Sequence, residues 1–242
     1  PALLAVSVAY GRVLAAEGHR PDVVAGHSLG EYSALVCAGA LGFADAVRLT
    51  RLRGRAMQSA VPVGVGTMAA MLMLKDEATV VELCAACAQG EVLEPAGFNT
   101  HGQTVIAGHV GAVGRAVERA AEWKGKGVEL NVSAPFHCSL LAPAEAQLAV
   151  ALDAVSIQAL SVPYAPNVTG QVVVSPDADS VRRNLVAQVS KPVRWLQSME
   201  SMTEFGVDRW LEVGAGRTLV GFVKRLDRKA DCSAFEEEKW RT

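Results

Sequence analysis

The chain of 242 residues carries 23 Lys and Arg against 25 Asp and Glu, and half of its residues are hydrophobic. This length can bury a sizeable core, in one large domain or in a domain with an insertion. The balanced charge excludes a basic footprint for nucleic acid and a polybasic patch for a membrane surface, and no apolar run is long enough to span a bilayer. Five cysteines, an odd number, favour a reduced, cytoplasmic compartment.

The first quarter of the chain predicts three helices and one short strand. Apolar residues at helical spacing cover 1–17, and Gly18 ends this helix. A short apolar run at 23–25 then meets the turn at 26–30, which leads directly into a second helical pattern. A third helix is predicted over 45–61. The order strand, sharp turn, helix is therefore centred on residue 28.

The pattern changes between 65 and 131. Strand-like and helical stretches alternate there, at 67–74, 77–88, 104–109, 110–123 and 128–132, with a turn at 99–102. This order predicts a small split βαβ module inserted into a larger body. Alternating strands and helices elsewhere predict an α/β body with a mainly parallel sheet. We therefore divide the chain into a larger body, residues 1–64 and 132–242, and a small subdomain, residues 65–131.

Gly26-x-Ser28-x-Gly30 is the pattern of a nucleophile elbow. A serine on a tight strand-to-helix turn projects its hydroxyl away from the sheet, and the flanking glycines relieve crowding in the strained backbone. Backbone N–H groups at the start of the helix can then stabilise an oxyanion. A glycine-rich turn with an ordinary helix-capping serine would show the same letters, but the strand before it and the helix after it favour a nucleophile.

A serine nucleophile needs a base, and the chain offers five histidines. His27 should point to the other side of the turn, as a structural residue or a pocket wall. His19 and His109 lie in turn-like contexts without a supporting pattern. His137 lies in a loop before a helix, downstream of the serine, which is the chain order of an elbow serine that recruits a later histidine. A surface histidine is the alternative for His137.

One arginine of the third predicted helix lies on its apolar side. At 100° per residue, Arg53 shares a stripe with Leu49 and Met57, whereas Arg48 and Arg51 lie opposite with Arg55. A buried guanidinium without a partner is costly, so an internal salt bridge is one explanation. The other is a guanidinium kept for a carboxylate ligand, which arginine can bind through two parallel hydrogen bonds.

Six segments occur in order along the chain: GHSLGEYSALVCAGAL, DAVRLTRLRGRAMQ, FNTHGQTVIAGH, APFHCSLL, KPVRW and LEVGAGRTLVGFVKR. Together they resemble the acyl-CoA:acyl carrier protein transacylases of fatty acid and polyketide synthesis, above all the bacterial malonyl-specific members, over residues 1–225. The resemblance implies an α/β-hydrolase-like large subdomain with an inserted ferredoxin-like small subdomain, and a catalytic cleft between them. It also implies malonyl-CoA and an acyl carrier protein as partners, no cofactor, and a monomer.

The resemblance implies catalytic roles for four residues. Ser28 is acylated by the thioester, with the N–H of Leu29 as an oxyanion donor, and His137 matches the general base. Gln188 lies where the family orients the histidine with a backbone carbonyl in place of an aspartate side chain. The expected reaction is a ping-pong transfer.

Four further residues are implied in substrate binding. Arg53 matches the arginine that binds the malonyl carboxylate, and Asn99 matches a polar residue of the small subdomain near the cleft. Phe136 resembles the malonyl-selective pattern, because members that take methyl-branched units tend to carry a smaller residue there. His27 is assigned to the pocket wall.

The chain departs from the family pattern at both ends. The family has an N-terminal Gly-Gln-Gly motif whose glutamine contributes to the oxyanion hole. This chain starts at Pro1, after that motif, so we expect a missing segment and weakened activity. The ending at 231–242 matches no family pattern and receives no role.

Three alternatives remain open at this stage. The first is a serine esterase or thioesterase built on the same elbow. The second is a truncated, inactive domain that only docks acyl carrier protein. The third is a metal or redox role for Cys84-x-x-Cys87, which the absence of a second cysteine pair and the helical pattern LCAACA disfavour.

Overall fold

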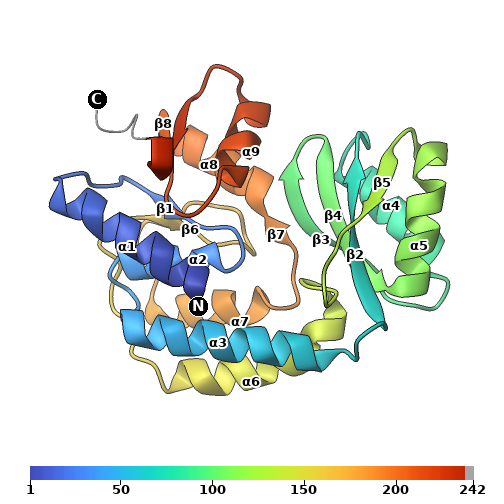
Figure 1. Ribbon diagram of the computed structural model, residues 1–242, viewed down its shortest axis with the longest axis horizontal. Helices are drawn as coiled ribbons and strands as arrows, with labels where there is room; N and C mark the ends of the chain where they lie inside the picture. Colours follow the sequence, from blue (N-terminus) through green and yellow to red (C-terminus); the bar gives the residue numbers. More distant parts are fainter. Residues whose placement is uncertain (238–242) are drawn as a thin grey trace.

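Two groups of elements lie side by side in the computed structural model, which describes residues 1–237 (Figure 1). The middle of the chain forms one group: β2 (Gly66–Leu72), α4 (Glu77–Ala88), β3 (Leu93–Thr100), β4 (Gln103–His109), α5 (Val110–Arg119), the 3-10 turn η1 (Ala120–Trp123) and β5 (Lys126–Glu129). The first part of the chain contributes to the other group α1 (Ala2–Ala16), β1 (Val24–Ala25), α2 (Gly30–Cys37) and α3 (Phe43–Ala60). The last part contributes η2 (Ser139–Leu141), α6 (Ala142–Asp153), β6 (Tyr164–Ala165), α7 (Ala178–Ala187), β7 (Val193–Arg194), α8 (Trp195–Phe205), β8 (Arg209–Glu212), α9 (Thr218–Leu226), β9 (Asp231–Ala234) and η3 (Phe235–Glu237).

The middle group, called the small unit below (residues 66–129), is a sheet with two helices on one face. Its strands lie in the order β5-β2-β4-β3 and pair antiparallel. Strand β7, from the other group, adds to β3 in parallel through Gly97↔Val193 and Phe98↔Arg194. Helices α4 and α5 pack on this sheet around buried side chains that include Met71, Leu83 and Ile106. The sheet thus connects the small unit to the rest of the molecule through backbone hydrogen bonds.

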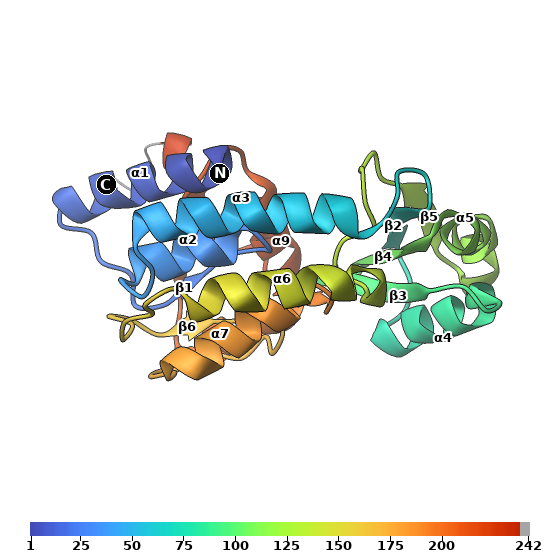
Figure 2. The same cartoon turned by 90° about the horizontal axis from the view of Figure 1, so that it is seen from below.

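The remaining elements form the large part, which consists of helices packed around short strands. Helices α3 and α6 run alongside each other, with α7 next to α6 and α1 and α2 on the other side (Figure 2). Their shared core includes Leu4, Tyr32, Leu35, Met57 and Leu148. Strand β1 pairs in parallel with β6, and β8 with β9. No helix among the described residues is long and apolar enough to cross a membrane.

The two crossings between the small unit and the large part lie in contact. The chain enters the small unit at Gly66, and it returns through a loop that contains Pro135. A Cβ placed on Gly66 would lie 2.4 Å from Cγ of Pro135. Only glycine fits at this crossing, so the two connections form a narrow neck.

The structure differs from the sequence-based prediction in the small unit and in the sheets. A turn was predicted at 99–102, but strand β3 extends to Thr100, and its regular pairing with β4 is broken between Pro95 and Gly97. Pro95 and Gly97 interrupt the hydrophobic pattern of this strand, so β3 was not predicted from the sequence. A mainly parallel sheet was predicted for the larger body. Among residues 1–237, the strand pairs within that body, β1–β6 and β8–β9, are parallel as predicted, but they are short and separate and do not form one sheet. The antiparallel sheet belongs to the small unit.

The cysteine pair of α4 packs in the core. Cys84 and Cys87 are both buried among the apolar side chains between α4 and the sheet, which confirms the interpretation of LCAACA as a packing helix. No three His, Cys, Asp or Glu side chains of residues 1–237 gather as metal ligands. The segment 231–237 forms β9 and η3, and the remainder of the unassigned ending lies outside the described residues.

Candidate active site

The turn between β1 and α2 has the strained backbone of a nucleophile elbow. Ser28 adopts φ 52°, in the left-handed region that non-glycine residues rarely occupy. A Cβ on Gly26 would lie 2.0 Å from the backbone C and O of Gly30, so position 26 requires glycine. A Cβ on Gly30 would meet nothing within 4 Å. The expectation that both glycines relieve crowding is therefore correct for Gly26 and wrong for Gly30.

Ser28 and His137 form a hydrogen-bonded pair although 109 residues separate them. Ser28 Oγ lies 2.7 Å from His137 Nε2, and His137 Nδ1 lies 2.7 Å from the backbone oxygen of Gln188. Because a carbonyl oxygen can only accept, Nδ1 carries the hydrogen and Nε2 of the neutral ring is free to accept. The Ser28 hydroxyl therefore donates to His137, the orientation that proton abstraction requires.

Burial keeps the imidazole neutral. His137 is 6% exposed, and desolvation, together with the positive charge of Arg53, lowers the pKa of His137 from 6.5 to about 3. The imidazole is thus unprotonated at neutral pH. The backbone carbonyl of Gln188 opposes this shift, because it would stabilise the protonated ring.

Arg53 reaches the serine from the buried face of α3. Its Nη2 donates to Ser28 Oγ and to Oε1 of Gln188, both at 2.9 Å. Its Nε is buried and finds no hydrogen-bond partner within residues 1–237. No ion pair of the described residues involves Arg53, so the structure does not show the internal salt bridge that the sequence left open. Burial lowers the pKa of the guanidinium. The arrangement places a guanidinium beside the serine, where it can bind an anionic ligand.

Two buried polar residues behind the elbow were missed by the sequence analysis. The carboxylate of Glu31 accepts from Nε2 of Gln188 at 2.7 Å and from the backbone N–H of Asn167 at 3.1 Å. The side chain of Asn167 accepts from the N–H of Ser28 at 2.7 Å. Glu31 gave one signal in the sequence, as a charged residue within an apolar helical stretch, whereas Asn167 lies in a loop that gave none.

His27 and Asn99 connect the elbow to the small unit. His27 Nε2 lies 2.9 Å from Oδ1 of Asn99 on β3, and the imidazole packs against the rings of Trp195 and Phe222 at 5.5 and 6.3 Å between centroids. The His27 ring therefore lies among β3, α8 and α9. Asn99 of the small unit thus contacts His27, the residue directly before Ser28.

Phe136 and Leu29 adjoin the pair in sequence. Phe136 precedes His137 and is half-buried, packed against two of the hydrophobic clusters, one in the large part and one that reaches into the small unit. Leu29 follows Ser28 and precedes the first residue of α2. The N–H of Ser28 itself is taken up by Asn167, so the next backbone donor along the chain is that of Leu29.

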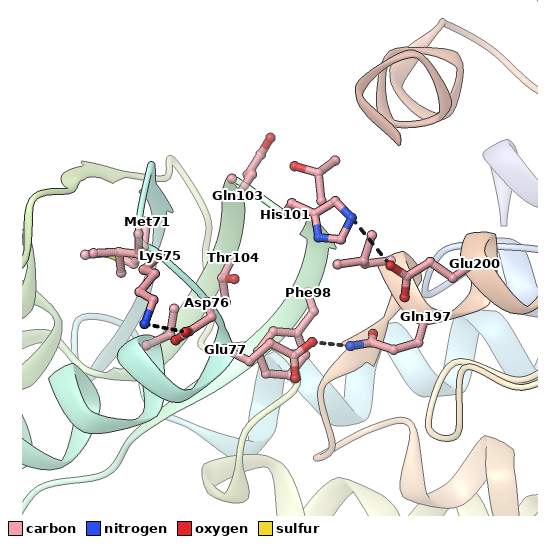
Figure 3. A pocket seen from close by; sticks show the side chains of 15 residues that line it. Met71, Lys75, Asp76, Glu77, Phe98, His101, Gln103, Thr104, Gln197 and Glu200 are labelled. Atoms are coloured by element: carbon pink, nitrogen blue, oxygen red, sulfur yellow. Dashed lines mark hydrogen bonds and ion pairs between the residues drawn. The ribbon is translucent and has the colours of Figure 1, made fainter. Parts of the chain in front are cut away.

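Two of the other histidines have partners elsewhere. His109 Nδ1 accepts from the backbone N–H of Val92. His101 pairs with Glu200 at 3.4 Å, across a separate pocket of about 260 Å³ between the small unit and α8 (Figure 3). Glu77 and Gln197 meet across the same pocket, and its lining includes none of the eight predicted site residues.

A serine at a strained elbow, a neutral histidine on its hydroxyl and a buried arginine beside it are the parts of an acyl-transferring enzyme that selects an anionic acyl group. The chain belongs to the acyl transferase domain family, which matches residues 1–234.

Its relatives carry a more specific name. The malonyl CoA-acyl carrier protein transacylase of Escherichia coli K12 is 46% identical over 242 residues, covering 98% of this chain and 76% of the relative. The transacylase of the same name from Coxiella burnetii superposes with a TM-score of 0.93 at 43% identity, covering 97% of this chain and 74% of that structure. A malonyl transacylase in complex with a type II polyketide synthase acyl carrier protein superposes with a TM-score of 0.92 at 43% identity, covering 97% and 75%.

Proposed function

We propose that this protein transfers a malonyl group from malonyl-CoA to the phosphopantetheine thiol of an acyl carrier protein, through an acyl-enzyme on Ser28. One observation carries the proposal: Ser28 Oγ lies 2.7 Å from Nε2 of a neutral histidine and 2.9 Å from the guanidinium of Arg53. The histidine suits a nucleophilic serine, and the guanidinium suits an acyl group that ends in a carboxylate. The relatives named above support the choice of malonyl.

In the first half-reaction, Ser28 Oγ attacks the thioester carbonyl carbon while His137 Nε2 takes its proton. The backbone oxygen of Gln188 stabilises the imidazolium through Nδ1–H. The N–H of Leu29 is the proposed donor to the oxyanion of the tetrahedral intermediate. The carbon–sulfur bond then breaks, and the proton on Nε2 goes to the sulfur of coenzyme A. Ser28 is left as a malonyl ester.

In the second half-reaction, the thiol of the carrier protein gives its proton to His137 and attacks the ester. The carbon–oxygen bond breaks, and Ser28 recovers the proton. Arg53 holds the malonyl carboxylate through both halves. Asn99 and His27 line the adjoining wall of the cleft, and Phe136 narrows it against branched acyl groups.

The proposal extends to the architecture, the localisation and the oligomeric state of the protein. The large part would be α/β-hydrolase-like, and the strand order β5-β2-β4-β3 with two helices on one face supports a ferredoxin-like small unit. We assign residues 1–64 and 132–242 to the first and 65–131 to the second. The enzyme would act as a cytoplasmic monomer.

The test is intact-protein mass spectrometry after brief incubation with malonyl-CoA. Wild-type protein should gain one malonyl group, and Ser28→Ala should gain none. Addition of phosphopantetheinylated acyl carrier protein should then remove the group from the enzyme and place it on the carrier. A folded wild-type protein that gains no adduct would reject the proposal.

The hydrolase alternative is separated by the same experiment. An esterase or thioesterase would release free malonate from the adduct without acyl carrier protein, whereas a transferase should retain the adduct until the thiol arrives. A domain that only docks the carrier would form no adduct. The guanidinium of Arg53, with Nη2 2.9 Å from Ser28 Oγ, favours the transferase, because a simple esterase needs no carboxylate receptor.

A further inference from the structure

Glu31 is a buried acid behind the nucleophile. It lies on the first turn of α2, is 1% exposed, and is surrounded by polar groups from several elements. Oε2 accepts from the amide of Gln188 and from the backbone N–H of Asn167, while Oε1 has no hydrogen-bond partner among the described residues. The charged or titratable groups that face it are Arg53 from α3, Tyr164 from β6 and the neighbouring Tyr32. Such a costly burial calls for a role.

The contacts of Glu31 fix the orientation of one amide. Oε2 receives two N–H donors, so it acts as an acceptor, and Gln188 must turn its NH₂ group toward it. The amide oxygen of Gln188 then faces Nη2 of Arg53 at 2.9 Å. In the flipped orientation, the amide oxygen would face Glu31 and the backbone oxygen of Ser28, and the NH₂ group would face the guanidinium, which replaces three hydrogen bonds by three repulsive contacts.

Glu31 supports the elbow by a second route. The backbone N–H of Asn167 donates to Glu31, and the side chain of Asn167 accepts from the N–H of Ser28 and donates to the backbone oxygen of Gly26. The NH₂ group of Gln188 also donates to the backbone oxygen of Ser28 at 2.9 Å. One carboxylate thus links the strained backbone of the nucleophile to the residue that holds the guanidinium.

We propose that Glu31 is a positioning residue for acyl selectivity: it fixes the amide of Gln188 so that Arg53 stays beside Ser28 Oγ, where it receives the carboxylate of the acyl group. This inference rests on the proposed function and assigns the control of its specificity to a residue that touches no substrate. Loss of Glu31 should therefore harm acylation by a carboxylated thioester more than acylation by a neutral one.

The readout is the ratio of acylation rates with malonyl-CoA and acetyl-CoA, measured by intact mass on the whole protein. Glu31→Leu removes the acceptor and keeps the volume, so the ratio should fall by about tenfold or more, as for a lost hydrogen bond to a charged group. Glu31→Gln keeps an acceptor oxygen, so the ratio should stay within about threefold, well short of that loss. Ser33→Ala is the matched control, because Ser33 is a buried polar residue of the same helix without a hydrogen-bond partner within residues 1–237.

A merely structural role would lower both rates together and leave the ratio unchanged. An unchanged ratio in Glu31→Leu overturns the inference, as does a Glu31→Gln variant that loses as much selectivity as Glu31→Leu. Gln188→Met tests the same link from its other end, because it removes the amide but keeps the backbone oxygen that binds His137. If Glu31→Leu does not fold, Gln188→Met decides: a preserved ratio rejects the inference.

The wild-type protein separates this inference from the proposed function. No malonyl adduct on the wild type rejects the function. An adduct on the wild type, with the ratio preserved in the Glu31 and Gln188 variants, rejects only the positioning role.

Discussion

Replacement of Arg53 by methionine separates the contribution of this residue to malonyl acylation from its contribution to the stability of the fold. Methionine fills much of the same space but removes the donors to Ser28 Oγ and Gln188 and the unpaired Nε–H. Loss of one partner from a buried charge pair costs about 3–5 kcal/mol, and each 1.36 kcal/mol is a factor of ten in rate. Acylation by malonyl-CoA should therefore fall by about 200-fold to about 5000-fold. Acylation by acetyl-CoA, which has no carboxylate, should not fall with it.

The same substitution should leave the fold as stable as before, or more stable. In the free protein Arg53 is 7% exposed and hydrogen-bonds only to neutral groups. The penalty for burying a charge is several kcal/mol, whereas a hydrogen bond from a charged group returns about 1.5–3 kcal/mol, so the two bonds of Arg53 at most offset that penalty. The free energy of unfolding of Arg53→Met should thus equal or exceed that of the wild type, as measured by urea denaturation.

Both measurements have a matched control on the same helix. Arg51 is exposed on the opposite side of α3, so Arg51→Met should change neither the acylation rates nor the stability. The reasoning is refuted if Arg53→Met acylates with malonyl-CoA within about fivefold of the wild type, or loses activity with both thioesters alike, because then no charge pair of the expected size exists.

Two further predictions follow from the elbow and its base. Because burial lowers the pKa of His137 from 6.5 to about 3, the base stays unprotonated as the pH falls. Acylation at about pH 5.5 should stay within about twofold of that at about pH 7.5, whereas an unshifted histidine would lose about tenfold. Burial also raises the pKa of Glu31 to about 7, so protonation of Glu31 is a second source of any fall in rate over this pH range. The Glu31→Gln variant lacks this titration and should be measured alongside. A tenfold fall in both proteins contradicts the prediction. Gly26→Ala should cost about 3 kcal/mol or more, because its Cβ would lie 2.0 Å from backbone atoms, whereas Gly30→Ala should cost less than about 1 kcal/mol; equal losses in urea denaturation would rule this out.

The local patterns of the sequence predicted the parts of the site that lie on regular elements. Helical periodicity placed Arg53 on the buried side of α3, and the exposed Arg48, Arg51 and Arg55 confirm that prediction. Strand, turn and helix placed Ser28 on an elbow, and its positive φ agrees. The contact of Ser28 with His137 spans 109 residues, and it was inferred from the family resemblance and from chain order.

What the sequence could not provide is the polar network behind the elbow. The orientation of the Gln188 amide depends on Glu31, and the backbone of Ser28 depends on Asn167, 139 residues away. Each of these pairings is set by tertiary packing, and no periodicity encodes it. Strand β3 was missed for a local reason, because Pro95 and Gly97 interrupt its pattern.

The neck at Gly66 and Pro135 bears on how this enzyme can be recombined. A protein engineer who wishes to exchange the small unit between relatives would cut the chain at its two crossings. Since a Cβ on Gly66 would lie 2.4 Å from Pro135, the two positions must come from the same parent. His137 lies two residues beyond this crossing, so a mismatched junction would displace the proposed general base. A graft with one junction before Gly66 and the other after Pro135 would keep the crossing intact, and the proposed catalytic pair would remain with the host.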